Sequence, residues 1–162
     1  MDNIRNYSEA SQQNLCDMRL GMRVDRAAEL IPQTAHPTYF TIYVGKILMT
    51  LLLGEVTVAI GNATNMLFRH DPDTGTTANI AANLAVGAFD AGEIITLPIT
   101  GLLTDALLPA AHAGSTVVMS PVGIVMTPGI IECVCDGNSG TGIMKWSLWY
   151  VPLDDGAYVT VT

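Results

Sequence analysis

The sequence predicts an all-β fold: one β-sandwich, jelly-roll-like or barrel domain over residues 41–162, with an extended, partly helical N-terminal arm over residues 1–40. Three observations predict it. Apolar residues alternate with small or polar ones, as in EVTVAIG (55–61), which is the period of a half-buried strand. β-Branched and aromatic residues are concentrated in segments such as TYFTIYV (38–44). Short apolar segments recur with turn-forming Gly, Pro, Asn and Asp between them, which is typical of a sandwich or barrel.

The first 40 residues differ in composition from the rest of the chain. They hold four of its seven basic residues, Arg5, Arg19, Arg23 and Arg26. A helix could begin at Ser8 or Ser11, and VDRAAEL (24–30) suits a helical turn, whereas the prolines of PQTAHPT (32–38) end any helix. Two interpretations stay open: a disordered N-terminus, or an arm that orders only against a neighbouring molecule.

The most apolar stretch, YVGKILMTLLLGEVTVAIG (43–61), is too short to be a membrane span. Its uncharged run is bounded by Lys46 and Glu55, whereas a transmembrane helix needs about 20 apolar residues. The polar start of the chain also lacks the apolar region of a signal peptide. We therefore expect no membrane partner and interpret the stretch as two or three strands, with a bulge or tight bend at Gly54.

Composition favours self-association over nucleic-acid binding. The formal net charge of −8 argues against a nucleic-acid partner, which needs clustered Lys and Arg. Hydrophobic residues make up 49% of the chain and charged residues 14%. This apolar excess fits a well-filled core, but we favour apolar surface reserved for subunit contacts. Three cysteines without a signal peptide suggest a reducing compartment and no disulfide framework.

The sequence contains no recognisable catalytic or cofactor motif, so we predict neither enzymatic activity nor a cofactor. The three histidines, His36, His70 and His112, lack metal-ligand spacing. Cys133 and Cys135 share one strand face and could bind a soft metal ion. We prefer to interpret the two cysteines as small residues of the core.

Two further features of the predicted strands have both a functional and a structural interpretation. Glu55, inside an apolar strand, is interpreted as structural, either solvent-exposed or paired with Lys46 or an arginine of the arm. In KWSLWY (145–150), Trp146 and Trp149 fall on opposite faces of a strand. Trp149 therefore packs in a second layer or serves as an interface contact.

Three motifs resemble those of one family. They are VDRAAELIPQT (24–34), GKILMTLLLGEVTVAIG (45–61) and GIMKWSLWYVPLDDGAYV (142–159). In order and spacing they resemble small structural proteins of tailed-bacteriophage virions, which are similar to capsid decoration (cement) proteins. The resemblance covers nearly the whole chain.

The resemblance implies a homo-oligomer, a trimer, that is made in the host cytoplasm and binds between major capsid proteins on the virion surface. It implies that Arg19, Arg23 and Arg26 pair with acidic groups of the shell. Tyr39, Phe40 and Trp149 are the further candidates for capsid or subunit contacts. The alternative is a tail or head-fibre component with a receptor- or glycan-binding role, for which WSLWYVPLDDG (146–156) could supply an aromatic platform.

Overall fold

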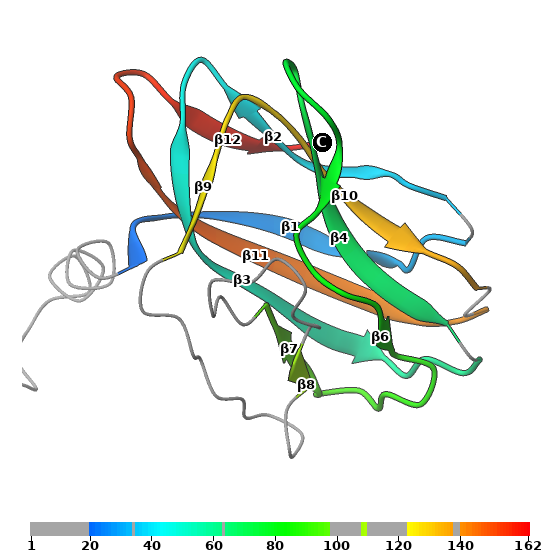
Figure 1. Cartoon of the computed structure of the whole chain (residues 1–162). Helices are drawn as coiled ribbons and strands as arrows, with labels where there is room; N and C mark the ends of the chain where they lie inside the picture. The colour runs from blue at the N-terminus through cyan, green and yellow to red at the C-terminus, as the bar shows by residue number, and fades with distance from the viewer. Residues whose placement is uncertain (1–19, 34, 63, 98–107, 110–122, 138–139) are drawn as a thin grey trace, which may run out of the picture.

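The computed structural model describes residues 20–33, 35–62, 64–97, 108–109, 123–137 and 140–162. These residues form a nearly all-β structure with two antiparallel sheets, as the sequence predicts (Figure 1). The sheets share one hydrophobic core. No helix among the described residues has the length and apolar character needed to cross a membrane.

The first sheet is built around β3, the longest strand in the described part of the chain. Its strand order is β1-β11-β3-β7-β8, and β9 also pairs with β3. Because β9 pairs with the start of β3 and β7 with its end, the two short strands share one edge of β3. The bounds are β1 Met22–Leu30, β11 Ile143–Pro152, β3 Ile47–Val58, β7 Ile94–Thr96, β8 Leu108–Pro109 and β9 Ile124–Met126.

The second sheet contains the C-terminal strand of the chain at one edge. Its order is β12-β2-β10-β4-β5, and β6 also pairs with β4. The bounds are β12 Tyr158–Val161, β2 Thr38–Tyr43, β10 Gly129–Cys135, β4 Asn65–Pro72, β5 Ala78–Asn79 and β6 Leu84–Ala85. The C-terminal strand is therefore held against β2 rather than against its neighbour in sequence, β11.

Alternation along β11 fills the core between the sheets. Trp146, Leu148 and Tyr150 are buried, whereas Lys145 is exposed and Trp149 is half-buried, which confirms the predicted division of faces. The ring of Trp146 lies 4.7 Å from that of Phe68, a residue of the opposite sheet. Such edge-to-face aromatic pairs add to the stabilisation from buried apolar area.

The bulge or tight bend predicted at Gly54 is wrong, because the register of β3 against β11 shifts elsewhere. β3 runs unbroken through Gly54, which pairs with Trp146 on one side and Ile95 on the other. A Cβ atom at Gly54 would lie 2.6 Å from Cη2 of Trp146. The glycine is therefore needed because the indole of a neighbouring strand lies flat over its backbone, not because the chain turns there.

The helical turn predicted over VDRAAEL is also wrong. Residues 22–30 form β1, an edge strand that pairs with β11. Residues 38–40, likewise assigned to the arm by sequence, belong to β2 in the other sheet. Pairing with a long neighbouring strand outweighs the weak helical preference of Ala and Glu. The helix start expected at Ser8 or Ser11 lies outside the described residues.

Candidate interaction surface

The structure places the six predicted contact residues in different environments. Arg19 lies outside the described residues. Tyr39 and Phe40 are buried in the core, at 4% and 0% exposure, so in the isolated chain they offer no surface to a partner. Arg26 is buried as well, and Arg23 and Trp149 lie on the outer face of the first sheet.

Arg26 is held by its own chain. Its guanidinium stacks 4.3 Å from the centre of the Tyr39 ring and forms an ion pair with Glu29 at 2.6 Å. Its Nη1 also donates a hydrogen bond to the backbone carbonyl of Thr162, just beyond β12. Arg26 thus joins edge strands of the two sheets, and its role in the folded chain is structural.

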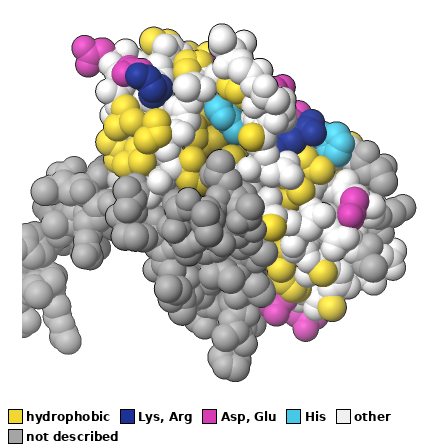
Figure 2. All heavy atoms as spheres, in the orientation of Figure 1, with side chains coloured by type: hydrophobic (Ala, Val, Ile, Leu, Met, Phe, Trp, Pro, Cys, Tyr) yellow, Lys and Arg dark blue, Asp and Glu magenta, His cyan; other side chains and the backbone are white. Residues whose placement is uncertain are grey.

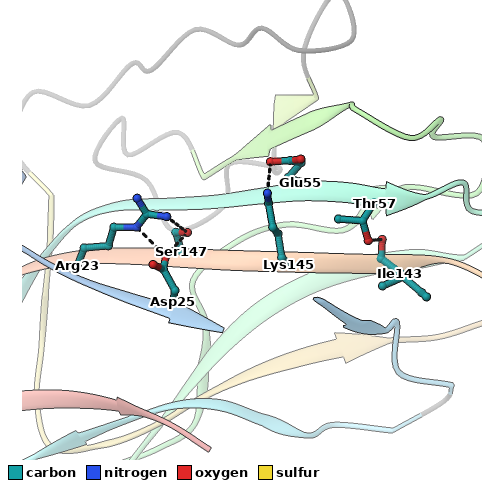
Figure 3. Close-up of polar contacts among 7 residues, drawn as sticks. All are labelled: Arg23, Asp25, Glu55, Thr57, Ile143, Lys145 and Ser147. Atoms are coloured by element: carbon teal, nitrogen blue, oxygen red, sulfur yellow. Dashed lines mark hydrogen bonds and ion pairs between the residues drawn. The ribbon is translucent and has the colours of Figure 1, made fainter. Parts of the chain in front are cut away.

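A polar network covers the middle of the outer face, where β1 and β11 run side by side (Figure 3). Arg23 Nε lies 2.6 Å from an Asp25 carboxylate oxygen, and the hydroxyl of Ser147 donates to the same carboxylate at 2.6 Å. The Arg23 guanidinium also lies 5.0 Å from the centre of the Trp149 ring. The arginine therefore covers one face of the tryptophan.

The electrostatics of this network keep Asp25 ionised. Partial burial raises the pKa of Asp25, but the hydrogen bonds from Ser147 and Arg23 and the positive charges of Arg23 and Lys145 together hold that pKa below its ordinary value. At neutral pH the network therefore presents an exposed ion pair between Arg23 and Asp25.

Glu55 lies on the same face and is paired. Its carboxylate forms an ion pair with Lys145 at 2.8 Å, across the β3–β11 ladder (Figure 3). The structural interpretation of Glu55 is confirmed, with Lys145 as the partner in place of Lys46 or an arginine. Lys46 instead lies 3.6 Å from Asp154.

Exposed apolar side chains gather at one end of the two sheets, which we call the apolar end. There the β2–β3 and β11–β12 connections lie together, because the backbone N–H of Leu153 donates to the carbonyl of Lys46 at 2.9 Å. In Figure 2, this end lies at the upper left, where hydrophobic side chains gather beside charged ones. Of the ten large hydrophobic side chains exposed in the described residues, six lie here: Tyr43, Val44, Val125, Val151, Leu153 and Tyr158.

The contacts at the apolar end show that it is an ordered surface. The rings of Tyr43 and Tyr158 are stacked with centroids 5.1 Å apart. Leu48 pairs with Val125 on one side and Val151 on the other, which places the three side chains in a row across the first sheet. Large apolar groups fixed in this way lose little conformational entropy when a partner covers them.

Val44 is the most exposed of these side chains, at 71%, and its backbone is strained. Its φ of 70° is unusual for a β-branched residue and costs on the order of 1–3 kcal/mol. The surroundings fix this conformation: Lys46 N–H donates to the Asp154 carboxylate at 2.8 Å, and Gly45 is packed so closely that a Cβ atom would lie 2.5 Å from that of Asp154. In this strained conformation the Val44 side chain is exposed to solvent.

The cysteine pair lies in the core. Cys133 and Cys135 are buried with their sulfur atoms 3.9 Å apart, and burial raises the pKa of Cys133 well above its ordinary value. Both are free thiols. In the described part of the chain, no three His, Cys, Asp or Glu residues are grouped to hold a metal ion.

Sequence reasoning missed the apolar end because its residues come from four separate segments. A signal was present nonetheless: Val44 and Leu153 are large apolar residues at turn positions, next to Gly45 and Asp154, where polar residues are usual.

Comparison with family models, with curated proteins and with solved structures finds no match to this chain.

Proposed function

We propose that this chain is a structural virion protein of a tailed bacteriophage, which decorates and stabilises the capsid by binding as a homotrimer between major capsid proteins. The observation that carries the proposal is the apolar end, an ordered apolar surface with no cover from the described chain. A gathering of exposed apolar side chains of this kind is a feature of protein–protein contact sites. The two packed sheets, in a sandwich-like arrangement, supply the rigid body that presents it.

The size of the apolar end argues for binding by several linked copies. Its six side chains are each about half exposed, so covering them contributes roughly 1 kcal/mol apiece, about 6 kcal/mol together. Association of two proteins costs an estimated 4–15 kcal/mol in lost freedom of motion. One copy therefore binds weakly. A trimer engages three sites at once, so the second and third contacts form at high effective concentration.

The polar face supplies the electrostatic part of the proposed contact. Arg23 is half exposed in its ion pair with Asp25, so it can exchange this partner for an acidic group of the shell. Its neighbour Trp149 would then be covered by the partner. In such an assembly the decoration protein acts mechanically, because it adds buried area across joints that packaged DNA places under load.

Binding to particles that lack the protein tests this proposal. Purified wild-type chain and two variants, Val44→Asp and Val58→Asp, are added to such particles, and the bound copies are counted by quantitative mass spectrometry. Aspartate tolerates the left-handed backbone at position 44, so the first variant keeps its fold. Val58 is 42% exposed and lies at the opposite end of β3, which makes it the matched control.

The proposal expects Val44→Asp to lose at least tenfold in binding, because about 1.4 kcal/mol of lost contact has that effect. Val58→Asp should bind like the wild type. Equal binding of all three proteins, or a loss confined to Val58→Asp, would contradict the proposed docking surface.

A further inference from the structure

A cavity of about 490 Å³ lies at the end of the molecule opposite the apolar end. It is formed where β4 begins and β10 ends, beside β6 and the loop that follows it. Its volume falls within the range of about 300–1,000 Å³ that is usual for small-molecule sites. The lining residues are Thr64, Asn65, Ala85, Gly87, Ala88, Phe89 and Asp136.

One side of the cavity carries hydrogen-bond acceptors in fixed positions. The Asp136 carboxylate accepts the backbone N–H and the side-chain amide of Asn65, both at 2.9 Å. These two bonds hold the pKa of Asp136 below its ordinary value, so the carboxylate is ionised at neutral pH. One hydrogen of the Asn65 amide is used in the bond to Asp136, so Asn65 can offer a ligand its amide oxygen and its second amide hydrogen.

Thr64 provides an independent sign that the cavity receives a polar ligand. This residue is only 3% exposed, and its hydroxyl has no hydrogen-bond partner in the described chain. A buried hydroxyl without a partner is unfavourable by about 1–3 kcal/mol. Such groups are rare in native proteins and call for an explanation. Because Thr64 lines the cavity, a ligand hydroxyl that reaches its side chain would satisfy it.

The rest of the cavity lining is apolar and fixed. It consists of Ala85, Gly87, Ala88 and the partly buried ring of Phe89. The backbone N–H of Val86 donates to the Thr64 carbonyl at 2.8 Å, and that of Ile60 donates to the Phe89 carbonyl at 2.9 Å. The loop is therefore held before any ligand arrives, which lowers the entropic cost of binding.

We propose that this cavity binds a saccharide, as a free monosaccharide or as the terminal residue of a glycan. A sugar ring has hydroxyl donors along its edge, which suit the acceptors of Asp136, Asn65 and Thr64, and an apolar C–H face, which suits Phe89. Phosphate and other anions do not fit, because the lining contains a carboxylate and no Lys or Arg. An organic cation fits less well, because one solvent-exposed carboxylate contributes little to binding.

This binding activity goes beyond capsid decoration and does not depend on it. Because the cavity and the apolar end lie at opposite ends of the sheets, a copy bound through its apolar end would keep the cavity facing outward. The two proposals can therefore fail separately.

The test is a titration of the isotope-labelled full chain, followed by amide NMR shifts, with methyl glycosides of glucose, galactose, mannose and N-acetylglucosamine as probes. The expected result is saturable shifts at the amides of Asn65, Gly87 and Asp136 for at least one glycoside, unchanged by added salt. A glycan ending in the same sugar should bind more tightly than the methyl glycoside if the glycan is the natural source; equal affinity would indicate the free sugar.

Two variants and one control complete the test. Asp136→Asn and Thr64→Val should each weaken binding at least tenfold, and Thr64→Val should fold normally because it removes only an unpartnered hydroxyl. Asp155→Asn, an equal change of charge at the apolar end, should bind like the wild type. The proposal is overturned by the absence of shifts with every glycoside, by unchanged affinity in Thr64→Val, or by shifts that appear only with an ammonium ligand and vanish in salt.

Discussion

Replacing Gly54 with alanine should destabilise the fold, because the added methyl group meets the indole of Trp146. The new Cβ atom would lie 2.6–2.8 Å from Cη2, Cζ3 and Cζ2 of the six-membered ring. Ordinary carbon contacts are about 3.5–4.0 Å, so the ring must move. It has little room to do so, because Trp146 is 1% exposed and is flanked by Phe68 at 4.7 Å and Tyr39 at 6.5 Å.

The magnitude follows from two opposed effects. Overpacking a filled core costs about 1–3 kcal/mol. Alanine offsets about 0.5–1 kcal/mol of this cost, because it loses less backbone entropy than glycine on folding. The free energy of unfolding should therefore fall by about 1–2 kcal/mol, which lowers Tm by roughly 2–8 °C for a chain of this size. Urea unfolding followed by far-UV circular dichroism measures the change.

A double-mutant cycle separates this clash from a general effect of alanine in the strand. The side chain of phenylalanine is shorter than that of tryptophan. Trp146→Phe therefore removes the outer part of the indole, which carries the three clashing atoms. In the Trp146→Phe background, Gly54→Ala should cost less than 0.5 kcal/mol, or stabilise the chain, and the coupling should exceed about 1 kcal/mol. An equal cost in both backgrounds, or a more stable single Gly54→Ala variant, would refute the packing described here.

Two further outcomes follow from the pKa shifts. Ser147→Ala should raise the pKa of Asp25 toward its ordinary value of 3.8, as measured by NMR titration of the carboxyl group; an unchanged pKa would mean that the hydroxyl does not bond to it. Because folding lowers this pKa, the stability that the bond contributes is present above pH 3.8 and lost as the pH falls through the folded value. Cys133 should resist alkylation in the folded protein and react in urea, read by peptide mass spectrometry; fast alkylation in the native state would contradict its burial.

The strands of the core were predictable where one segment carries its own pattern. KWSLWY alternates cleanly, so the buried face of β11 could be assigned from the sequence. The apolar run of β3 was long and flanked by β-formers, which was enough to identify a strand.

The sequence-based predictions were wrong where residues distant in the sequence determine the local structure. Gly54 looks like a bend because a sequence cannot show that Trp146, 92 residues later (146 − 54), lies over it. VDRAAEL looks helical until it is paired with β11, and Arg26 looks like a surface charge until it stacks on Tyr39. Long-range pairing outweighs local propensity at each of these positions.

The candidate surfaces were less predictable than the fold. The apolar end joins Val44, Val125 and Leu153 from separate segments, and only their place beside turns hints at exposure. The cavity around Thr64 and Asp136 likewise joins residues that no short motif connects. A surface that joins residues from separate segments can be recognised only once the structure is known.

The proposed role places many copies of this chain in the virions of a phage that carries its gene, and counting those copies tests the proposal most directly. Quantitative mass spectrometry gives the ratio of the chain to the major capsid protein. Capsid decoration predicts a ratio close to one to one, because only the shell offers so many equivalent positions. A few copies per particle would instead indicate a tail or fibre component, and absence from the particle would contradict a role in the virion.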